Sequence, residues 1–585
     1  MTLHSIIEQF DDLMDVPDSV SKLRQFILQL AVQGKLTEQD PSDEPAEQLL
    51  ERIQAEKQRL YEAGEIRKPR SLDPVSGKEV WHPIPNHWVW TKLGEVGRIK
   101  GGNTPKTSVD EYWAHDGIPW LTPADLNGLQ SKTISRGARD ISQSGLDNCS
   151  AKLLPTGTVL FSSRAPIGYV AIAANPIATN QGFKNVRPYE MGMSEYIYYF
   201  LKFAGKRINR EASGTTFTEV SGKDVANIPF PLPPLEEQQR IVATVDRLMD
   251  EYDTLEAQQE AAARVRVRCT EAATHALQTA DTPAAVRTAW HRLRDHFATL
   301  TATPDAVDAV RQTILQLAVQ GKLTEQDPSD EPAEVLLERI QAEKQRLYEA
   351  GEIRKPKTAK PIEEEKDLAT LSEGWAWARL ANVIVEGPRN GYSPKTVEYK
   401  TDVKRLDLSA TTSGYFKPGY FEYVDESIEV DSPLWLEDGD ILIQRGNSIE
   451  YVGIAAIYDG PDKEYIYPDL MMRLKPSENI STKFLHQALI TKATRDYYRS
   501  NASGTSGSMP KINQGVVLNT LIPVPPRKEQ QRIVATVERL MDACDTLETQ
   551  LSRQQALGAE LLDAVLHAAA QGDEQPALVE AVTAG

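Results

Sequence analysis

Short polar loops in two parts of the chain carry the residue types that contact nucleic acids. The segment 100–107 places Lys100 and Lys106 beside glycines and hydroxyl side chains. Lysines, hydroxyls and backbone N–H groups are the usual contacts to phosphate oxygens. Taken alone, such a loop is equally compatible with a plain turn. The chemistry that this segment indicates is therefore phosphate contact, with a structural turn as the alternative.

A second kind of polar loop follows an apolar run in each half of the chain. Segment 162–164 follows the run 158–161, and segment 444–448 closes the run that begins at Ile441. Arg pairs bidentately with guanine, and Gln or Asn pairs with adenine, so different residues here would read different bases. Both halves also contain a Ser-Gly-Thr triplet followed by a lysine, which suits a phosphate-gripping loop. Matched positions in two diverged segments favour contact over plain turns.

Catalytic motifs are absent from the sequence. It contains no GxxxxGK[ST] phosphate loop, no GxGxxG after a strand, and no HExxH or CxxC metal-ligand spacing. The Asn/Asp-Pro-Pro-aromatic tetrapeptide of adenine methyltransferases is also missing. We therefore predict a chain that binds rather than catalyses, with no cofactor or metal of its own.

Two long internal repeats organise the chain. Residues 27–69 return at 314–356 with a single difference, Gln48 against Val335. The segment that starts PPLEEQQRIVATVDRLMD at Pro233 returns at Pro525 in closely similar form. Repeats of this length mean duplicated structural units. The chain therefore consists of two tandem units, each with a nearly invariant and a divergent part.

The repeated segments are predicted to be helical. Apolar residues recur every three or four positions in 46–61 and in a narrow stripe from Ile241 to Leu255. A narrow stripe over several turns is typical of a long helix that packs along a partner helix. We expect 236–280 and 306–350 to form an antiparallel central pair, and the N-terminal and C-terminal helices to pair likewise. This arrangement would close the molecule into a pseudo-two-fold ring.

The divergent segments, about 88–230 and 375–522, are predicted to be β-rich. Each has short apolar β-type runs separated by Gly, Pro, Asn and Ser. Each starts with two tryptophans, which we expect in the core rather than as base-stacking platforms. Each ends in a Pro-rich exit that favours extended backbone and reads as a stiff hinge. The predicted fold class is α+β: two globular α/β-mixed domains, separated and flanked by long antiparallel helical pairs.

Composition and charge limit the classes of protein to which the chain can belong. The chain has 585 residues, a net charge of −19 and only three cysteines, which suits a reducing cytoplasm. No apolar stretch is long enough to span a membrane. Segment 88–230 has 16 Lys and Arg against 12 Asp and Glu, and segment 375–522 has 16 against 19. The acidity therefore lies in the repeated helices, as a solvated face or as a complement to a basic partner, and it does not exclude DNA binding.

The organisation resembles the specificity subunit of Type I restriction–modification systems. The duplicated LAVQGKL and EQQRIVATV blocks, which flank two divergent domains that look like target-recognition domains, carry the resemblance over the whole chain. It implies helical regions at 1–83, 236–371 and 527–585, and recognition domains at 84–235 and 372–526. It also implies a non-catalytic subunit.

The resemblance implies a set of partners as well. Each recognition domain would read one half of a bipartite double-stranded DNA target, and the central helices would set the spacer. Two methyltransferase subunits would bind S-adenosylmethionine and methylate adenine, and motor–nuclease subunits would use ATP and magnesium. The resemblance also implies a cytoplasmic protein of a bacterium or archaeon, without a membrane partner.

The loops described above match the family's DNA-facing surface in position only. The residues predicted to contact DNA are Lys100, Asn103, Thr104, Lys106, Thr107, Ser162, Ser163, Arg164, Ser213, Thr215, Thr216, Lys223, Arg389, Asn390, Tyr392, Ser393, Gln444, Arg445, Asn447, Ser448, Ser503, Thr505, Ser506 and Lys511. The rival interpretation is a protein-binding helical scaffold without DNA contact. A single-chain nuclease or methyltransferase is disfavoured by the missing motifs.

Overall fold

The computed structural model describes residues 16, 18–69, 71–164, 166–213, 219–280, 283–296, 300, 303–357, 359–362, 368, 370–504 and 509–571. The chain divides into two compact units, 1–261 with 555–585 and 262–554. Two helices of 45 residues, α8 (Leu235–Thr279) and α17 (Arg527–Gln571), contribute residues to both units. Each unit combines helices with small sheets, so the predicted mixed α and β class is confirmed.

The first unit starts with α2 (Ser19–Gln33) and α3 (Ala46–Glu62). Its β-rich domain has three sheets in the strand orders β1-β11, β2-β10-β7-β8-β5 and β3-β6-β4-β9, with mainly antiparallel pairs. The strands are β1 (Val89–Lys92), β2 (Gly97–Gly101), β3 (Trp113–Ala114), β4 (Ile118–Leu121), β5 (Thr133–Ile134), β6 (Arg139–Ile141), β7 (Val159–Ser163), β8 (Ile167–Ala173), β9 (Ala178–Thr179), β10 (Lys184–Pro188) and β11 (Pro229–Leu232). The helices of this domain are α4 (Leu93–Val96), α5 (Gln143–Asp147), α6 (Ser194–Ser213) and α7 (Gly222–Ala226).

The second unit repeats this plan. Its sheets have the orders β12-β21, β13-β20-β17-β18 and β14-β16-β15-β19. The strands are β12 (Ala376–Arg379), β13 (Ile384–Asn390), β14 (Thr396–Val397), β15 (Val403–Leu406), β16 (Phe421–Val424), β17 (Ile441–Gln444), β18 (Ala455–Ile457), β19 (Tyr465–Ile466), β20 (Met471–Pro476) and β21 (Leu521–Val524). The helices are α9 (Pro283–Asp295), α11 (Pro304–Val319), α12 (Ala333–Glu349), α13 (Leu380–Val383), α14 (Thr482–Leu489), α15 (Lys492–Ser500) and α16 (Gln514–Leu518).

The Pro-rich exits, predicted to be stiff hinges, are strands of two-stranded sheets. Pro229 and Pro231 of β11 pair with Lys92 and Trp90 of β1, and β21 pairs with β12 in the same way. The predicted extended backbone is present, but it closes a two-stranded sheet, an edge position where proline is tolerated. The entry and exit of each β-rich domain therefore lie side by side.

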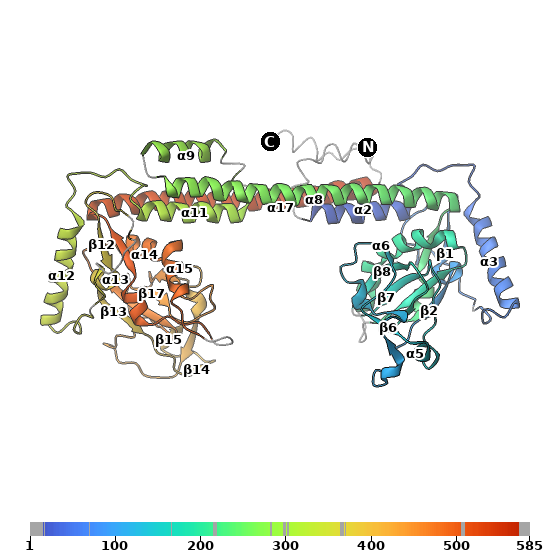
Figure 1. Cartoon of the computed structure of the whole chain (residues 1–585), viewed down its shortest axis with the longest axis horizontal. Coiled ribbons are helices and arrows are strands. Elements are labelled where there is room, and N and C mark those ends of the chain that lie inside the picture. The colour runs from blue at the N-terminus through green and yellow to red at the C-terminus, as the bar shows by residue number, and fades with distance from the viewer. Residues whose placement is uncertain are drawn as a thin grey trace. The chain divides into compact units, whose positions relative to one another are not determined.

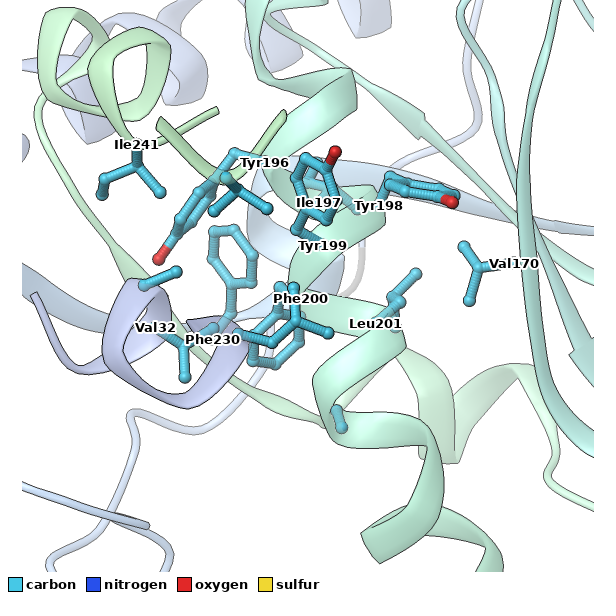
Figure 2. Packing of buried hydrophobic residues seen from close by; sticks show 14 of the residues in the cluster. Val32, Val170, Tyr196, Ile197, Tyr198, Tyr199, Phe200, Leu201, Phe230 and Ile241 are labelled. Carbon is cyan, nitrogen blue, oxygen red and sulfur yellow. The ribbon is translucent and has the colours of Figure 1, made fainter. Parts of the chain in front are cut away.

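The core of the first unit joins its helical and β-rich parts. Tyr196 and Phe200 of α6 pack on Phe230 of β11, with ring centroids 5.7 and 4.9 Å apart. Val32 of α2 and Ile241 of α8 belong to the same buried cluster (Figure 2). Helix α6 lies against β8 in this domain (Figure 1). The apolar residues in the first part of α8 are thus covered by the first β-rich domain and by α2.

The helices pair differently from the expected central pair. In the first unit, Gln39 contacts Glu237 and Arg24 contacts Glu256, so α2 runs antiparallel to α8. In the second unit, Arg311 of α11 contacts Glu548 of α17.

The direction of α11 relative to α8 corrects the prediction. The Thr270 hydroxyl donates to the Leu300 oxygen, just before α11, and Gln278 Nε2 donates to the Thr313 hydroxyl within α11. Both sets of residue numbers increase together, so the end of α8 and α11 run in the same direction. The expectation of an antiparallel central pair is wrong, because the additional helix α9 packs on the end of α8 and reverses the chain before α11 begins. The N-terminal and C-terminal helices do meet, through Lys22 and Asp563 at 2.7 Å.

Candidate nucleic-acid interface

Each β-rich domain is fastened to a long helix through a buried tryptophan and a buried glutamate. Trp88 Nε1 donates to Glu237 Oε2 at 2.8 Å, and Gln39 Nε2 donates to Glu237 Oε1 at 2.6 Å. Burial raises the pKa of the Glu237 carboxyl. In the second unit Trp375 Nε1 donates to Glu529 Oε2 at 2.9 Å. These joints fix the start of each domain against the first turn of its helix.

In the first domain, the loop after β2 begins at Gly102, where a side chain has no room. A Cβ atom there would lie 2.1 Å from the carbonyl oxygen of Thr179. The following residue, Asn103, donates its backbone N–H to the same oxygen at 2.9 Å. The Thr104 hydroxyl donates to Gln181 Oε1 at 2.6 Å. The predicted loop 100–107 is therefore held against segment 179–184.

The loop after β7 joins the same place. Ser163 donates its N–H to the Gly182 oxygen at 2.8 Å, and Val220 donates its N–H to the Ser163 oxygen at 2.9 Å. Lys184 Nζ lies 3.2 Å from both Ser163 Oγ and Glu219 Oε1. The segments around residues 103, 163 and 220 thus converge, and Lys184, which sequence reasoning missed, lies among them.

The second domain builds the same arrangement from different residues. A Cβ on Gly391 would lie 2.1 Å from the Tyr467 oxygen, and Tyr392 donates its N–H to that oxygen at 2.9 Å. Arg445 donates its N–H to Leu470, and Ile512 donates its N–H to the Arg445 oxygen at 2.9 Å. The backbone pattern of both domains therefore matches, with Asn103 replaced by Tyr392 and Ser163 by Arg445.

Three predicted contact residues face the interior. Ser162, Ser163 and Gln444 are 0% exposed. Ser162 Oγ donates to the Pro166 oxygen at 2.8 Å, and Gln444 Nε2 donates to the Leu408 oxygen at 2.9 Å. These residues end strands β7 and β17 on the buried side, so in this structure their side chains hold the loops instead of facing a ligand.

Other predicted residues of the second domain are engaged with neighbours. Arg389 forms an ion pair with Glu386 at 2.8 Å. The Tyr392 hydroxyl donates to Glu426 at 3.1 Å, and the Ser393 hydroxyl donates to Asp469 at 2.6 Å. Asn447 Nδ2 donates to Gln444 at 2.6 Å. These bonds orient the polar side chains of the loops that follow β13 and β17.

The remaining predicted residues divide by exposure. Exposed ones are Lys106, Thr107, Lys223, Ser448, Ser503 and Lys511, and half-buried ones are Lys100, Asn103, Thr104, Arg164, Asn390 and Arg445. Thr215, Thr216, Thr505 and Ser506 lie outside the described residues, as does the side chain of Ser213. Each domain therefore presents lysine and hydroxyl groups around a hydrogen-bonded backbone frame.

Comparison with known proteins decides the family. The Type I restriction modification DNA specificity domain matches residues 85–263 and 390–554. The chain is 30% identical over 577 residues to the EcoEI specificity subunit of Escherichia coli, and 31% identical over 570 residues to the EcoAI specificity subunit of the same species; each match covers 94% of both chains. The chain belongs to the Type I specificity-subunit family. The prediction of a non-catalytic specificity subunit is confirmed by this membership.

A solved HsdS subunit from Thermoanaerobacter tengcongensis is also similar, at 20% identity. The match covers 85% of this chain and 100% of that chain, with a TM-score of 0.40.

This specificity subunit also carries a basic cluster around Lys100, of which only Lys100 was among the predicted contacts. Arg98 on β2 lies directly opposite Arg187 on β10. Burial lowers the pKa of Lys100, and the nearby cations Arg98, Arg67 and Lys152 lower it further. Like charges on adjacent strands repel each other, so this arrangement favours an anionic ligand. The available signal was Arg98 and Lys100 at strand spacing; the contribution of Arg187 required the strand pairing.

Other site types are not represented in the described part of the specificity subunit. It contains no group of three or more His, Cys, Asp or Glu side chains that could hold a metal ion. Among the same residues, no helix is long and apolar enough to cross a bilayer. The three cysteines, Cys149, Cys269 and Cys544, are free.

Proposed function

We propose that this chain recognises a bipartite DNA target within a Type I restriction–modification complex. The domain at 84–235 reads one half of the target, and the domain at 372–526 reads the other. The observation that supports this proposal is the matched backbone frame: Gly102 and Gly391 start equivalent loops, while the residues that follow them differ. A constant frame with variable side chains suits two readers of different half-sites.

The helical regions 1–83, 236–371 and 527–585 dock two methyltransferase subunits, and motor–nuclease subunits complete the complex. Those partners bind S-adenosylmethionine, ATP and magnesium. Helices α8 and α17, at about 1.5 Å per residue, are each about 67 Å long, which exceeds one DNA turn of about 34 Å. We therefore also propose that these two helices set the length of the spacer between the half-sites.

The test of half-site reading is a domain exchange. Segment 84–235 is replaced by the equivalent segment of another family member, and the methylated host DNA is mapped by single-molecule sequencing. One half-site should change while the other half-site and the spacer remain. A change in both half-sites, or in neither, would refute the assignment.

The spacer is tested by deletion. Removing about one turn from both α8 and α17 should change the spacer length and leave both half-site sequences intact. Altered half-site bases at constant spacing would contradict the ruler function.

The alternative function is a protein-binding scaffold. Filter binding across salt separates the two, because phosphate contacts give a steep negative slope of log affinity against log salt. If the DNA affinity of the assembled methyltransferase complex did not change with salt concentration, the scaffold function would be favoured.

A further inference from the structure

A pocket in the second unit has cations as most of its charged lining residues. It lies between the end of α12, the short helix α13 and the edge strand β13. Its charged lining residues are Lys344, Arg354, Lys355, Lys357, Arg389 and Glu386. None of Lys344, Arg354, Lys355 and Lys357 was among the predicted contact residues. The first three belong to the repeated segment 314–356 and not to the divergent domain.

Lys344 is the least expected of these cations, because it is 5% exposed and has no carboxylate partner among the described residues. Its Nζ donates to the backbone oxygen of Ala381 at 2.6 Å. Burial lowers the pKa of Lys344. A buried ammonium group costs free energy unless an opposite charge offsets it.

In the first unit, the lysine at the equivalent position of the repeat is neutralised by a carboxylate. Lys57 occupies the position of Lys344 in the first copy of the repeat, and its Nζ lies 2.6 Å from Glu95 Oε2. The position of Glu95 is taken by Asn382 in the second copy, so the carboxylate is lost there. The two copies are identical around the lysine and differ in the group that balances its charge.

The carboxylate that does line the pocket is already engaged. Glu386 pairs with Arg389 and with Arg473, both at 2.8 Å. The exposed cations Arg354 and Lys355 form no ion pair with any residue that the structure describes. The pocket therefore carries an excess of positive charge.

The pocket adjoins the candidate DNA interface. Lys357 Nζ donates to Gln514 Oε1, and Gln514 Nε2 donates to Asn390 Oδ1 at 3.3 Å. Asn390 is a predicted DNA contact at the end of β13. An anion in the pocket would therefore lie next to the loop that starts at Gly391.

We propose that this pocket binds a phosphate group through Lys344, Arg354 and Lys355, and that the group belongs to the DNA backbone. The assignment to DNA rests on the proposed function; the phosphate chemistry does not. The cations come from an invariant segment, so the contact is independent of base sequence. The divergent loops would read bases while the repeated segment grips the strand.

The first test measures phosphate binding without DNA. Thermal unfolding of the full-length chain is compared in inorganic phosphate and in chloride at equal ionic strength. Phosphate should raise the melting temperature of the wild type, because a ligand that binds only the folded state stabilises it. The rise should be smaller in Lys344→Met than in the wild type, and it should also shrink in Lys355→Ala, an exposed substitution that leaves the fold intact. The matched control Lys57→Met should keep the full rise.

The second test identifies the source of the phosphate. Filter binding of random duplex DNA to the full-length chain is measured across salt for the wild type and for the double variant Arg354→Ala/Lys355→Ala. The slope of log affinity against log salt should become shallower by about 0.9, since the two cations bind one phosphate and that contact is lost.

The outcomes separate the pocket from the wider function. The pocket variants could lose part of the phosphate-dependent rise in melting temperature while the salt slope of DNA binding stays unchanged. The pocket would then bind free phosphate, and the assignment of the phosphate to the DNA backbone would be wrong. A wild type that binds no DNA would count against the proposed function, and the melting experiment would still decide the pocket. Equal melting shifts in the wild type and Lys344→Met would overturn the phosphate site.

Discussion

The tryptophan–glutamate joint should contribute a measurable coupling energy to the stability of each unit. Trp88 is 4% exposed and Glu237 is 1% exposed, so water cannot replace a lost partner. A hydrogen bond to a charged group contributes about 1.5–3 kcal/mol. Trp88→Phe removes the donor and part of a ring that packs beside Tyr196, which adds about 1 kcal/mol. We expect a loss of about 3 kcal/mol in the unfolding free energy.

A double-mutant cycle isolates the bond from the packing. Trp88→Phe, Glu237→Met, which removes the acceptor, and the double variant are unfolded in denaturant and followed by circular dichroism. The coupling between the two sites should be about 2 kcal/mol, within the range for residues in direct contact.

The second unit supplies the matched control, because Trp375 bonds to Glu529 at 2.9 Å, nearly the same distance. The two compact units should unfold in separable transitions. The first cycle should shift one transition, and the cycle of Trp375→Phe with Glu529→Met should shift the other by a similar amount. Coupling below about 0.5 kcal/mol in both cycles would refute the view that the joint holds the domains.

Three further predictions concern the loops, the pH response and the helix pairs. Gly102→Ala should destabilise the first unit by about 1–3 kcal/mol and weaken DNA binding, because the added Cβ would collide with a backbone oxygen. Melting curves and filter binding measure the two effects. Gly101→Ala is the control for both, because its Cβ would lie 3.9 Å from the nearest atom. Burial lowers the pKa of His486, which is 6% exposed, so its neutral form is favoured in the folded state. The second unit should therefore lose stability as the pH falls below about 6.5, by at most about 1.4 kcal/mol per pH unit, and His486→Gln should remove that part of the pH dependence in melting curves. Arg311 lies 2.7 Å from Glu548 and is 19% exposed, so Arg311→Met should cost about 1 kcal/mol at low salt and less at about 1 M salt; an equal cost at both salt concentrations would argue against an electrostatic contribution.

Local pattern was sufficient for several elements. The apolar run predicted at 441–444 is β17, and the periodic segment 46–61 lies within α3. Trp88 and Trp375 are buried, as their place at the start of each domain indicated. Such features depend on neighbours within a few positions, so periodicity and residue type are enough to predict them.

Side-chain direction at the strand ends required the tertiary structure. Ser162 and Gln444 have the chemistry of base contacts, yet both point inward, because a one-residue change of register moves a side chain to the other face of a sheet. The direction of α11 also depended on a tertiary feature, the packing of α9 on the end of α8.

The sequence by itself determined the duplication, the family resemblance and the separation of acidic helices from nearly neutral recognition domains, since these are properties of order and composition. Only the tertiary structure decided which charges are balanced. Lys57 and Lys344 stand in identical segments, and one faces Glu95 while the other faces a backbone oxygen. The difference arises from residues of the divergent domains that fold against the repeat, and Coulomb interactions depend on distance in space rather than on distance along the chain.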